Sequence, residues 1–142
     1  MIGAARLLEY AIIDSSVVFT ACQALYVDGN LLGPVPQLAI CRDLSNEEIQ
    51  LFHCDKKWNV LGVSGCGTLR EIEKTAERGY RGLSGKWVVS PYSEEDLNRY
   101  MEVHWGKQRC SFCGRWPWQL QKLFVGADVG ICNDCVDSFH AI

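Results

Sequence analysis

Two short stretches decide how the end of this chain folds: Cys110-Ser111-Phe112-Cys113-Gly114 and Ile131-Cys132-Asn133-Asp134-Cys135. Each holds two cysteines that are two residues apart, and eighteen residues separate the pairs. Two intervening residues allow one tight turn to point both thiolates at a single metal. Two such turns complete a tetrahedron of four sulfurs, the arrangement that suits Zn²⁺. We therefore predict one Zn²⁺ per chain, with these ligands: Cys110, Cys113, Cys132 and Cys135.

The residues around the two pairs fit such a site. Gly114 directly follows the first pair, and a glycine there lets the backbone turn under the metal with a positive φ. The second pair can begin a helix over residues 134–141, whose dipole stabilises thiolate charge. Four thiolates leave no open position, so a structural zinc is favoured over a catalytic one. Two disulfides, four unrelated buried cysteines and an iron–sulfur site are the alternatives.

Composition predicts a globular protein of 142 residues, with 48% hydrophobic and 22% charged residues. The net charge of −3 offers no basic surface for nucleic acid or an anionic membrane. Arg6, Glu9 and Asp14 interrupt the apolar start, so neither a secretory signal nor a membrane span is expected. We expect a cytoplasmic location, where short-spaced cysteines favour metal over disulfides.

Residues 1–90 predict a small α+β domain with an antiparallel sheet. The β-type runs cover residues 17–27, 37–42, 48–54 and 58–63, with turn signals between them. Short connections between successive strands favour antiparallel pairing. Apolar residues at positions 7, 8, 11 and 12 have helical spacing and predict an N-terminal helix.

Two further helices are signalled by their caps. Thr68 with Glu71 three residues later predicts a helix start, and Gly79 fits the position just past its end. Ser93 with Asp96 predicts a second start. We interpret residues 91–106 as a helical connector, which leads to a zinc-binding domain over residues 107–142.

The last 33 residues, 110–142, resemble the N-terminal zinc-binding domain of ClpX, the unfoldase partner of the ClpP protease. The residues that carry the resemblance are Cys110 to Gly114, Lys122-Leu123, Gly126, and Val129 to Asp137. The resemblance implies a treble-clef-like fold, a homodimer, and docking of adaptors and substrates. That family places an ATPase after the finger. Here residues 82–87 lack the G-x4-G-K-[ST] frame that cradles phosphates, so no nucleotide is expected.

These features predict a non-enzymatic, zinc-stabilised adaptor or regulator. Its partners would be proteins, including a second copy of itself, and neither nucleic acid nor a membrane. Trp116 and Trp118 could form a docking surface, or they could pack within the chain. An immunity-type inhibitor that binds one partner protein is an alternative function.

A thiol-dependent enzyme in the N-terminal domain is a further alternative, with Cys54 or Cys66 as the reactive group. Cys66 lies between two glycines just before a helix, a place that can lower a thiol pKa. The simpler interpretation makes Cys22, Cys41, Cys54 and Cys66 buried structural cysteines. His104 is expected on a helix face, because the four cysteines already fill the metal site.

Overall fold

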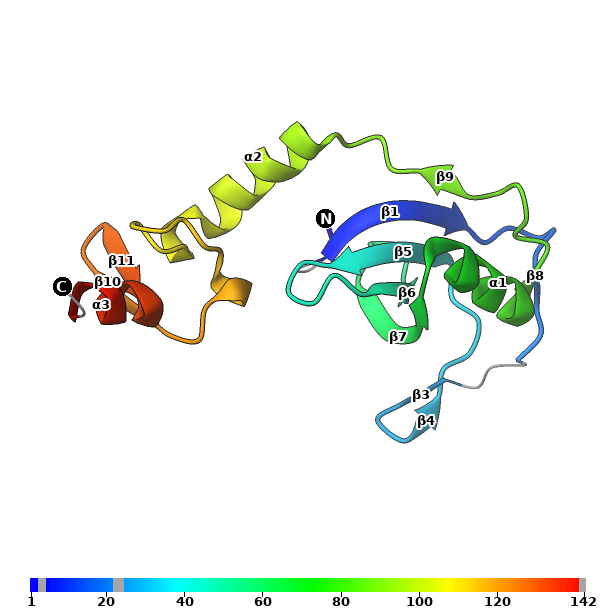
Figure 1. Cartoon of the computed structure of the whole chain (residues 1–142). Coiled ribbons are helices and arrows are strands. Elements are labelled where there is room, and N and C mark those ends of the chain that lie inside the picture. The colour runs from blue at the N-terminus through cyan, green and yellow to red at the C-terminus, as the bar shows by residue number, and fades with distance from the viewer. Residues whose placement is uncertain (3–4, 22–24, 141–142) are drawn as a thin grey trace. The chain divides into compact units, whose positions relative to one another are not determined.

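The computed structural model describes residues 1–2, 5–21 and 25–140, and it divides the chain into two compact units (Figure 1). The first unit is Met1–Pro91 and the second is Tyr92–Ile142. The described residues contain small antiparallel sheets and three α-helices, which confirms the predicted α+β class. None of these helices is long and apolar enough to cross a membrane.

The N-terminal unit is built on a five-stranded sheet with the order β7-β6-β5-β1-β9. Its pairings are all antiparallel, as the short connections predicted. The sheet strands are β1 (Ala5–Ile12), β5 (Gln37–Asp43), β6 (Ile49–Cys54), β7 (Val60–Gly67) and β9 (Val88–Val89). The short strands are β2 (Val18–Phe19), β3 (Tyr26–Val27), β4 (Asn30–Leu31) and β8 (Tyr80–Arg81). β2 pairs with β8, and β3 pairs with β4.

The prediction of an N-terminal helix is wrong, because residues 5–12 form β1. The cause is a β-bulge between Leu7 and Glu9, where the register against β5 shifts. A bulge adds one residue to the strand and changes which face the following side chains occupy. Leu7 and Tyr10 therefore share one face of the sheet, while Ala11 packs on the other. The bulge interrupts the alternation of apolar and polar residues along the strand. In the sequence alone, the apolar residues at positions 7, 8, 11 and 12 therefore have the spacing of a helix face.

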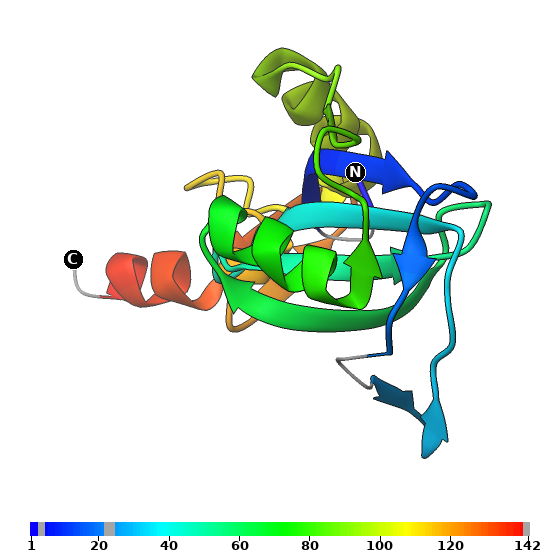
Figure 2. The ribbon, with the colours of Figure 1, turned by 90° about the vertical axis from the view of Figure 1, so that its right-hand side faces the viewer.

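The core of the N-terminal unit covers both faces of the sheet. On one face, Leu38, Ile40 and Leu51 pack against Ile72 and Ala76 of helix α1 (Leu69–Gly79). Figure 2 shows α1 lying along this face. The opposite face holds a second cluster, formed by Ala5, Ala39, Cys41, Phe52 and Cys54. β5 is thus buried from both sides over Gln37–Cys41.

The apolar run at residues 17–27 is not one strand, because its parts pair with different partners. β2 pairs with β8, which directly follows α1, whereas β3 forms a hairpin with β4. Asp28 and Gly29 form the turn of that hairpin with positive φ values of 53° and 79°, as a two-residue hairpin turn requires. Residues 22–24 lie outside the described residues, and the prediction for Cys22 falls among them.

The helix caps predicted from the sequence are confirmed. The Thr68 side chain accepts a hydrogen bond from the Glu71 amide at the start of α1. Ser93 and Asp96 form a reciprocal capping box at the start of α2 (Glu94–Trp105). Gly79 is the last residue of α1 rather than the residue after it.

The C-terminal unit consists of α2 and the cysteine-rich region. The 3₁₀ turns η1 (Gly106–Gln108) and η2 (Pro117–Gln119) flank the first cysteine pair. Strands β10 (Leu123–Gly126) and β11 (Val129–Cys132) form a hairpin, and α3 (Asn133–His140) follows at once. The order of turn, hairpin and helix is that of a treble-clef finger, as the resemblance implied.

Candidate metal centre

The structure brings the four predicted ligands to one place. The Sγ atoms of Cys110, Cys113, Cys132 and Cys135 all lie within 4.8 Å of one another. The first two come from the turn after η1, Cys132 ends β11, and Cys135 lies in the first turn of α3. The Cys110 and Cys135 sulfurs are 3.8 Å apart, and so are those of Cys113 and Cys132.

These separations fit a zinc ion. A tetrahedron with Zn–S bonds of about 2.3 Å has sulfur–sulfur edges of about 3.8 Å. A disulfide would need about 2.05 Å, so neither of these two sulfur pairs is bonded. Four thiolates around a closed tetrahedron match a structural Zn²⁺ and leave no position for substrate. The prediction of one Zn²⁺ per chain is therefore supported by the donor set and its geometry.

The first cysteine pair lies in a tight turn that closes on itself. Gly114 has a φ of 77°, as predicted, and its amide donates to the Cys110 carbonyl oxygen at 3.0 Å. The Cys110 amide donates in turn to the Arg115 carbonyl oxygen at 3.0 Å. An L-residue at Gly114 would be strained, because only glycine adopts such a φ readily. The turn thus fixes both sulfurs on the same side of the backbone.

Hydrogen bonds join this turn to the hairpin and the hairpin to α3. The Ser111 amide donates to the Gly130 carbonyl oxygen at 2.8 Å, and the Gly130 amide donates to Ser111 Oγ at 3.0 Å. At the other end of the hairpin, the Asn133 amide donates to the Lys122 carbonyl oxygen at 3.1 Å. The two cysteine pairs are therefore placed by backbone bonds as well as by the metal.

The Cys110 sulfur is prepared to carry negative charge. Its burial opposes ionisation, but the backbone amides of Cys113, Cys132 and Phe112 donate to it, and together they lower the pKa of Cys110 to about 6. The Cys113 amide lies 3.5 Å from this sulfur and the Cys132 amide lies 3.4 Å from it. Amide donors of this kind stabilise a metal-bound thiolate.

The pKa of Cys135 is shifted in the opposite direction from that of Cys110. Burial, together with the other three sulfurs, raises the pKa of the Cys135 thiol to about 12. Several thiolates this close repel one another unless a cation neutralises them. A divalent metal supplies that charge and deprotonates its thiol ligands outright.

Arg109 links helix α2 to the metal turn. Its Nε and Nη2 atoms donate to the Gly114 carbonyl oxygen at 2.9 and 2.7 Å, and its Nη1 donates to Glu102 Oε2 at 2.9 Å. The guanidinium also lies 3.9 Å from the centre of the Trp116 ring. No motif in the sequence marks Arg109, because its partners are a distant carbonyl group and a helix side chain.

The two tryptophans are half-buried and pack within the C-terminal unit. Trp116 stacks on Trp118 with ring centroids 5.6 Å apart, and Trp118 meets Trp105 of α2 edge-to-face at the same distance. Contacts within the chain therefore cover much of the surface of both tryptophans. This favours the interpretation in which they pack within the chain over the one in which they form a docking surface. Together with Arg109 they fasten α2 to the finger.

The remaining candidate residues lie away from the four sulfurs. Cys41 and Cys54 are buried in the sheet, where burial raises the pKa of Cys41 to about 12 and that of Cys54 to about 11. Cys66, in contrast, is exposed at the end of β7, so the interpretation of Cys66 as a buried cysteine is wrong. His104 is exposed on α2, where it stacks on Tyr100 with 3.8 Å between ring centroids. As expected, it occupies a helix face rather than the metal site.

The comparison with known families agrees with this geometry. Residues 108–142, about a quarter of the chain, match the ClpX C4-type zinc finger. The resemblance inferred from the cysteine motif is confirmed, and zinc binding belongs to this segment. No solved structure matches the chain.

Proposed function

We propose that this chain is a non-enzymatic adaptor or regulator whose zinc finger docks proteins, a second copy of the chain foremost. The observation that supports it is the set of exposed apolar side chains on the finger. Phe112, Val125 and Phe139 are 59%, 72% and 52% exposed although they belong to a folded module. Exposed apolar patches on small modules mark interaction sites.

The exposed residues come from each element that the metal holds together. Phe112 of the metal turn meets Phe139 of α3 edge-to-face, with ring centroids 5.6 Å apart. On the hairpin, Phe124 lies opposite Ile131, and Val129 lies two residues along on the same face. Phe124 and Val129 are 43% and 46% exposed. Aromatic anchors of this kind dominate the energy of protein interfaces.

A second copy of the chain is the simplest occupant of this surface. A two-fold contact needs only one patch, which is matched with itself. The resemblance to the ClpX finger points the same way, because it implies a homodimer. Adaptor or substrate docking would use whatever part of the surface the dimer leaves exposed.

Absence of catalysis is part of the proposal. It is supported by the closed four-thiolate site, which leaves zinc no open coordination position. The state of Cys54 also supports the absence of catalysis. Its buried thiol has a pKa of about 11, so at neutral pH it is not the thiolate that a nucleophilic cysteine requires. A cytoplasmic location agrees with a zinc site made of four reduced cysteines.

Nucleic acid, nucleotide and membrane are excluded from the proposed partners. The segment 107–142 carries four basic and three acidic side chains, and four thiolates with Zn²⁺ add −2. Non-specific binding to nucleic acid requires a net basic surface, since release of counterions drives it. Binding to duplex DNA or RNA that weakens steeply with salt would contradict this part of the proposal.

Sedimentation of the full chain over a dilution series, with zinc content measured in parallel, tests the docking surface. The wild type should shift from monomer to dimer as concentration rises. Phe112→Ala and Phe139→Ala should each weaken association about tenfold or more while zinc stays bound. Tyr26→Ala is the matched control, because Tyr26 is a 65% exposed aromatic residue of the N-terminal unit. A strict monomer at every concentration would refute self-association.

A further inference from the structure

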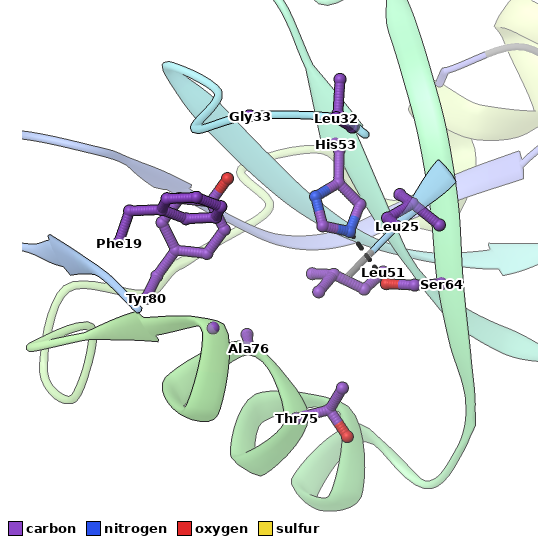
Figure 3. Close-up of a pocket in the computed structure, with 11 residues that line it drawn as sticks. Phe19, Leu25, Leu32, Gly33, Leu51, His53, Ser64, Thr75, Ala76 and Tyr80 are labelled. Carbon is purple, nitrogen blue, oxygen red and sulfur yellow. Dashed lines mark hydrogen bonds between the residues drawn. The ribbon is translucent and has the colours of Figure 1, made fainter. Parts of the chain in front are cut away.

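The N-terminal unit contains a cavity that the zinc finger does not explain. It has a volume of about 130 Å³ and lies between α1, strands β6 and β7, and the chain around β2 and β4 (Figure 3). Six of its lining residues are Phe19, Leu51, His53, Ser64, Ala76 and Tyr80. It lies within one unit, so its shape depends only on the packing described above.

The lining of this cavity is apolar with a small polar group on one side. No Asp, Glu, Lys or Arg is among the described residues that line it. Leu51, Ala76 and Phe19 provide apolar walls, and Phe19 packs on Tyr80 with ring centroids 5.2 Å apart. A charged ligand would lose its hydration here without meeting an opposite charge, which is costly.

His53 and Ser64 form the polar group. His53 Nε2 lies 2.8 Å from Ser64 Oγ, across the β6–β7 pairing. The second ring nitrogen, Nδ1, lies on the side of the ring nearer Phe19 and Tyr80 (Figure 3). No described residue forms a hydrogen bond with it. Burial lowers the pKa of His53 to about 4, so the ring is neutral at pH 7 and offers one further donor or acceptor.

Tyr80 is held in place by a backbone contact. The Val35 amide donates to its hydroxyl oxygen at 3.0 Å. The cavity wall at Leu25, just before β3, is also closely packed, because a Cβ on Gly62 of β7 would lie only 2.7 Å from Leu25 Cδ2. The walls are thus fixed by contacts from several elements, and such preformed concave sites suit small molecules.

We propose that this cavity binds a small, uncharged, mostly apolar molecule, with His53 Nδ1 as its hydrogen-bonding anchor. An engineered apolar cavity of about 150 Å³ in another protein takes benzene, so the volume suits a ligand of about six to eight heavy atoms. One hydrogen-bonding group on an apolar body matches one anchor in an apolar wall. All of the residues that line the cavity belong to the N-terminal unit.

The experiment uses the full-length chain with zinc bound and three probes of similar size: phenol, toluene and benzoate. Binding is followed by ¹H–¹⁵N NMR titration at pH 7. The wild type should bind phenol most tightly, toluene about threefold to tenfold more weakly, and benzoate not measurably. The shifted amide signals should include those of Ser64, Ala76 and Gly79, which line the cavity.

Two variants test the two parts of the proposal. His53→Phe keeps an aromatic ring at this position but removes both nitrogens, so the preference for phenol over toluene should disappear. Ala76→Leu fills the cavity and should abolish binding of both. Lys74→Leu is the control, because it adds an apolar side chain at an exposed position of the same helix.

Three results would overturn the proposal: no probe binds the wild type, benzoate binds as tightly as phenol, or Ala76→Leu binds as the wild type does. If Ala76→Leu does not fold, the phenol-to-toluene ratio in His53→Phe and the location of the shifted amides decide the question.

Discussion

The two units of this chain obtain their stability in different ways. The N-terminal unit buries apolar side chains on both faces of a five-stranded sheet. In the C-terminal unit, the buried hydrophobic residues within the described chain are only Met101, Cys110 and Cys132, and two of these belong to the metal site. The first unit therefore depends on the hydrophobic effect, and the second depends on the metal.

This difference explains why the finger can expose so many apolar residues. A module that folds around a metal needs little apolar burial, because metal binding supplies folding free energy. Phe112, Val125 and Phe139 are therefore available for contacts with other molecules. In the N-terminal unit, by contrast, the largest apolar side chains of β5 are fully buried.

The largest expected effect is loss of the metal. Cys132→Ser should release zinc and unfold the C-terminal unit, because structural zinc contributes about 10 kcal/mol or more to the folding of such modules. The N-terminal unit should remain folded, because none of the four zinc ligands belongs to its two core clusters. Zinc analysis and NMR spectra of the full chain report on both units at once.

Cys66→Ser is the control for this prediction. Cys66 is exposed and lies in β7, outside the four-sulfur cluster, so its replacement should leave the zinc content unchanged. Full zinc retention in Cys132→Ser would show that the other three cysteines hold the metal with a different fourth ligand. Collapse of both units in this variant would contradict their independence.

The converse change acts on the N-terminal core. Leu38→Ala should destabilise this unit by about 2–5 kcal/mol, because Leu38 is fully buried and its truncation leaves a cavity. Zinc content should not change. Urea unfolding followed by NMR signals of each unit measures the effect, with Leu61→Ala as control because Leu61 is 38% exposed. Zinc loss in parallel with unfolding of the sheet would show that the units are coupled.

The sequence predicted the metal site well because its information is local. Two residues between ligands, a glycine after the first pair and a helix after the second are all visible in the motif. The helix caps at Thr68 and Ser93 are local in the same way, since cap and partner lie three residues apart. Such patterns hold whatever the rest of the chain does.

Features that depend on distant partners could not be predicted. The bulge in β1 exists only relative to β5, so the apolar spacing at residues 7–12 predicts a helix where the structure has a strand. His53 and Ser64 are eleven residues apart on neighbouring strands, and neither carries a motif. The sequence leaves open whether Trp116 and Trp118 form a docking surface or pack within the chain, because their contacts with Arg109 and Trp105 are not local in sequence.

Acid should destabilise the N-terminal unit through His53. Its folded-state pKa of about 4 lies below the ordinary value of 6.5, because burial disfavours the charged ring. Between these values the unfolded chain binds more protons, so the free energy of unfolding falls as pH falls from about 6.5 to about 4. The upper limit of this loss is about 3 kcal/mol at pH 4, and partial exposure of the ring reduces it.

Urea unfolding at a series of pH values, followed by signals of the N-terminal unit, measures this loss. No carboxylate, lysine or arginine is among the described residues that line the cavity around His53, and its neighbours there include Ser64 and Tyr80. His53→Gln should therefore remove the part of the pH dependence that belongs to this ring. An unchanged pH profile in that variant would assign the acid sensitivity to other groups.

The smallest expected effect compares equivalent caps in the two units. Thr68→Ala removes the side-chain acceptor at the start of α1, and Ser93→Ala removes the one at the start of α2. Each substitution should lower the free energy of unfolding of its own unit by about 1 kcal/mol, since loss of an N-cap has this typical effect.

Because α2 is fastened to the finger through Arg109, Ser93→Ala should also weaken zinc retention against a chelator by about fivefold. Thr68→Ala should leave zinc retention unchanged. Equal zinc retention in the two variants would mean that α2 does not contribute to the stability of the metal site.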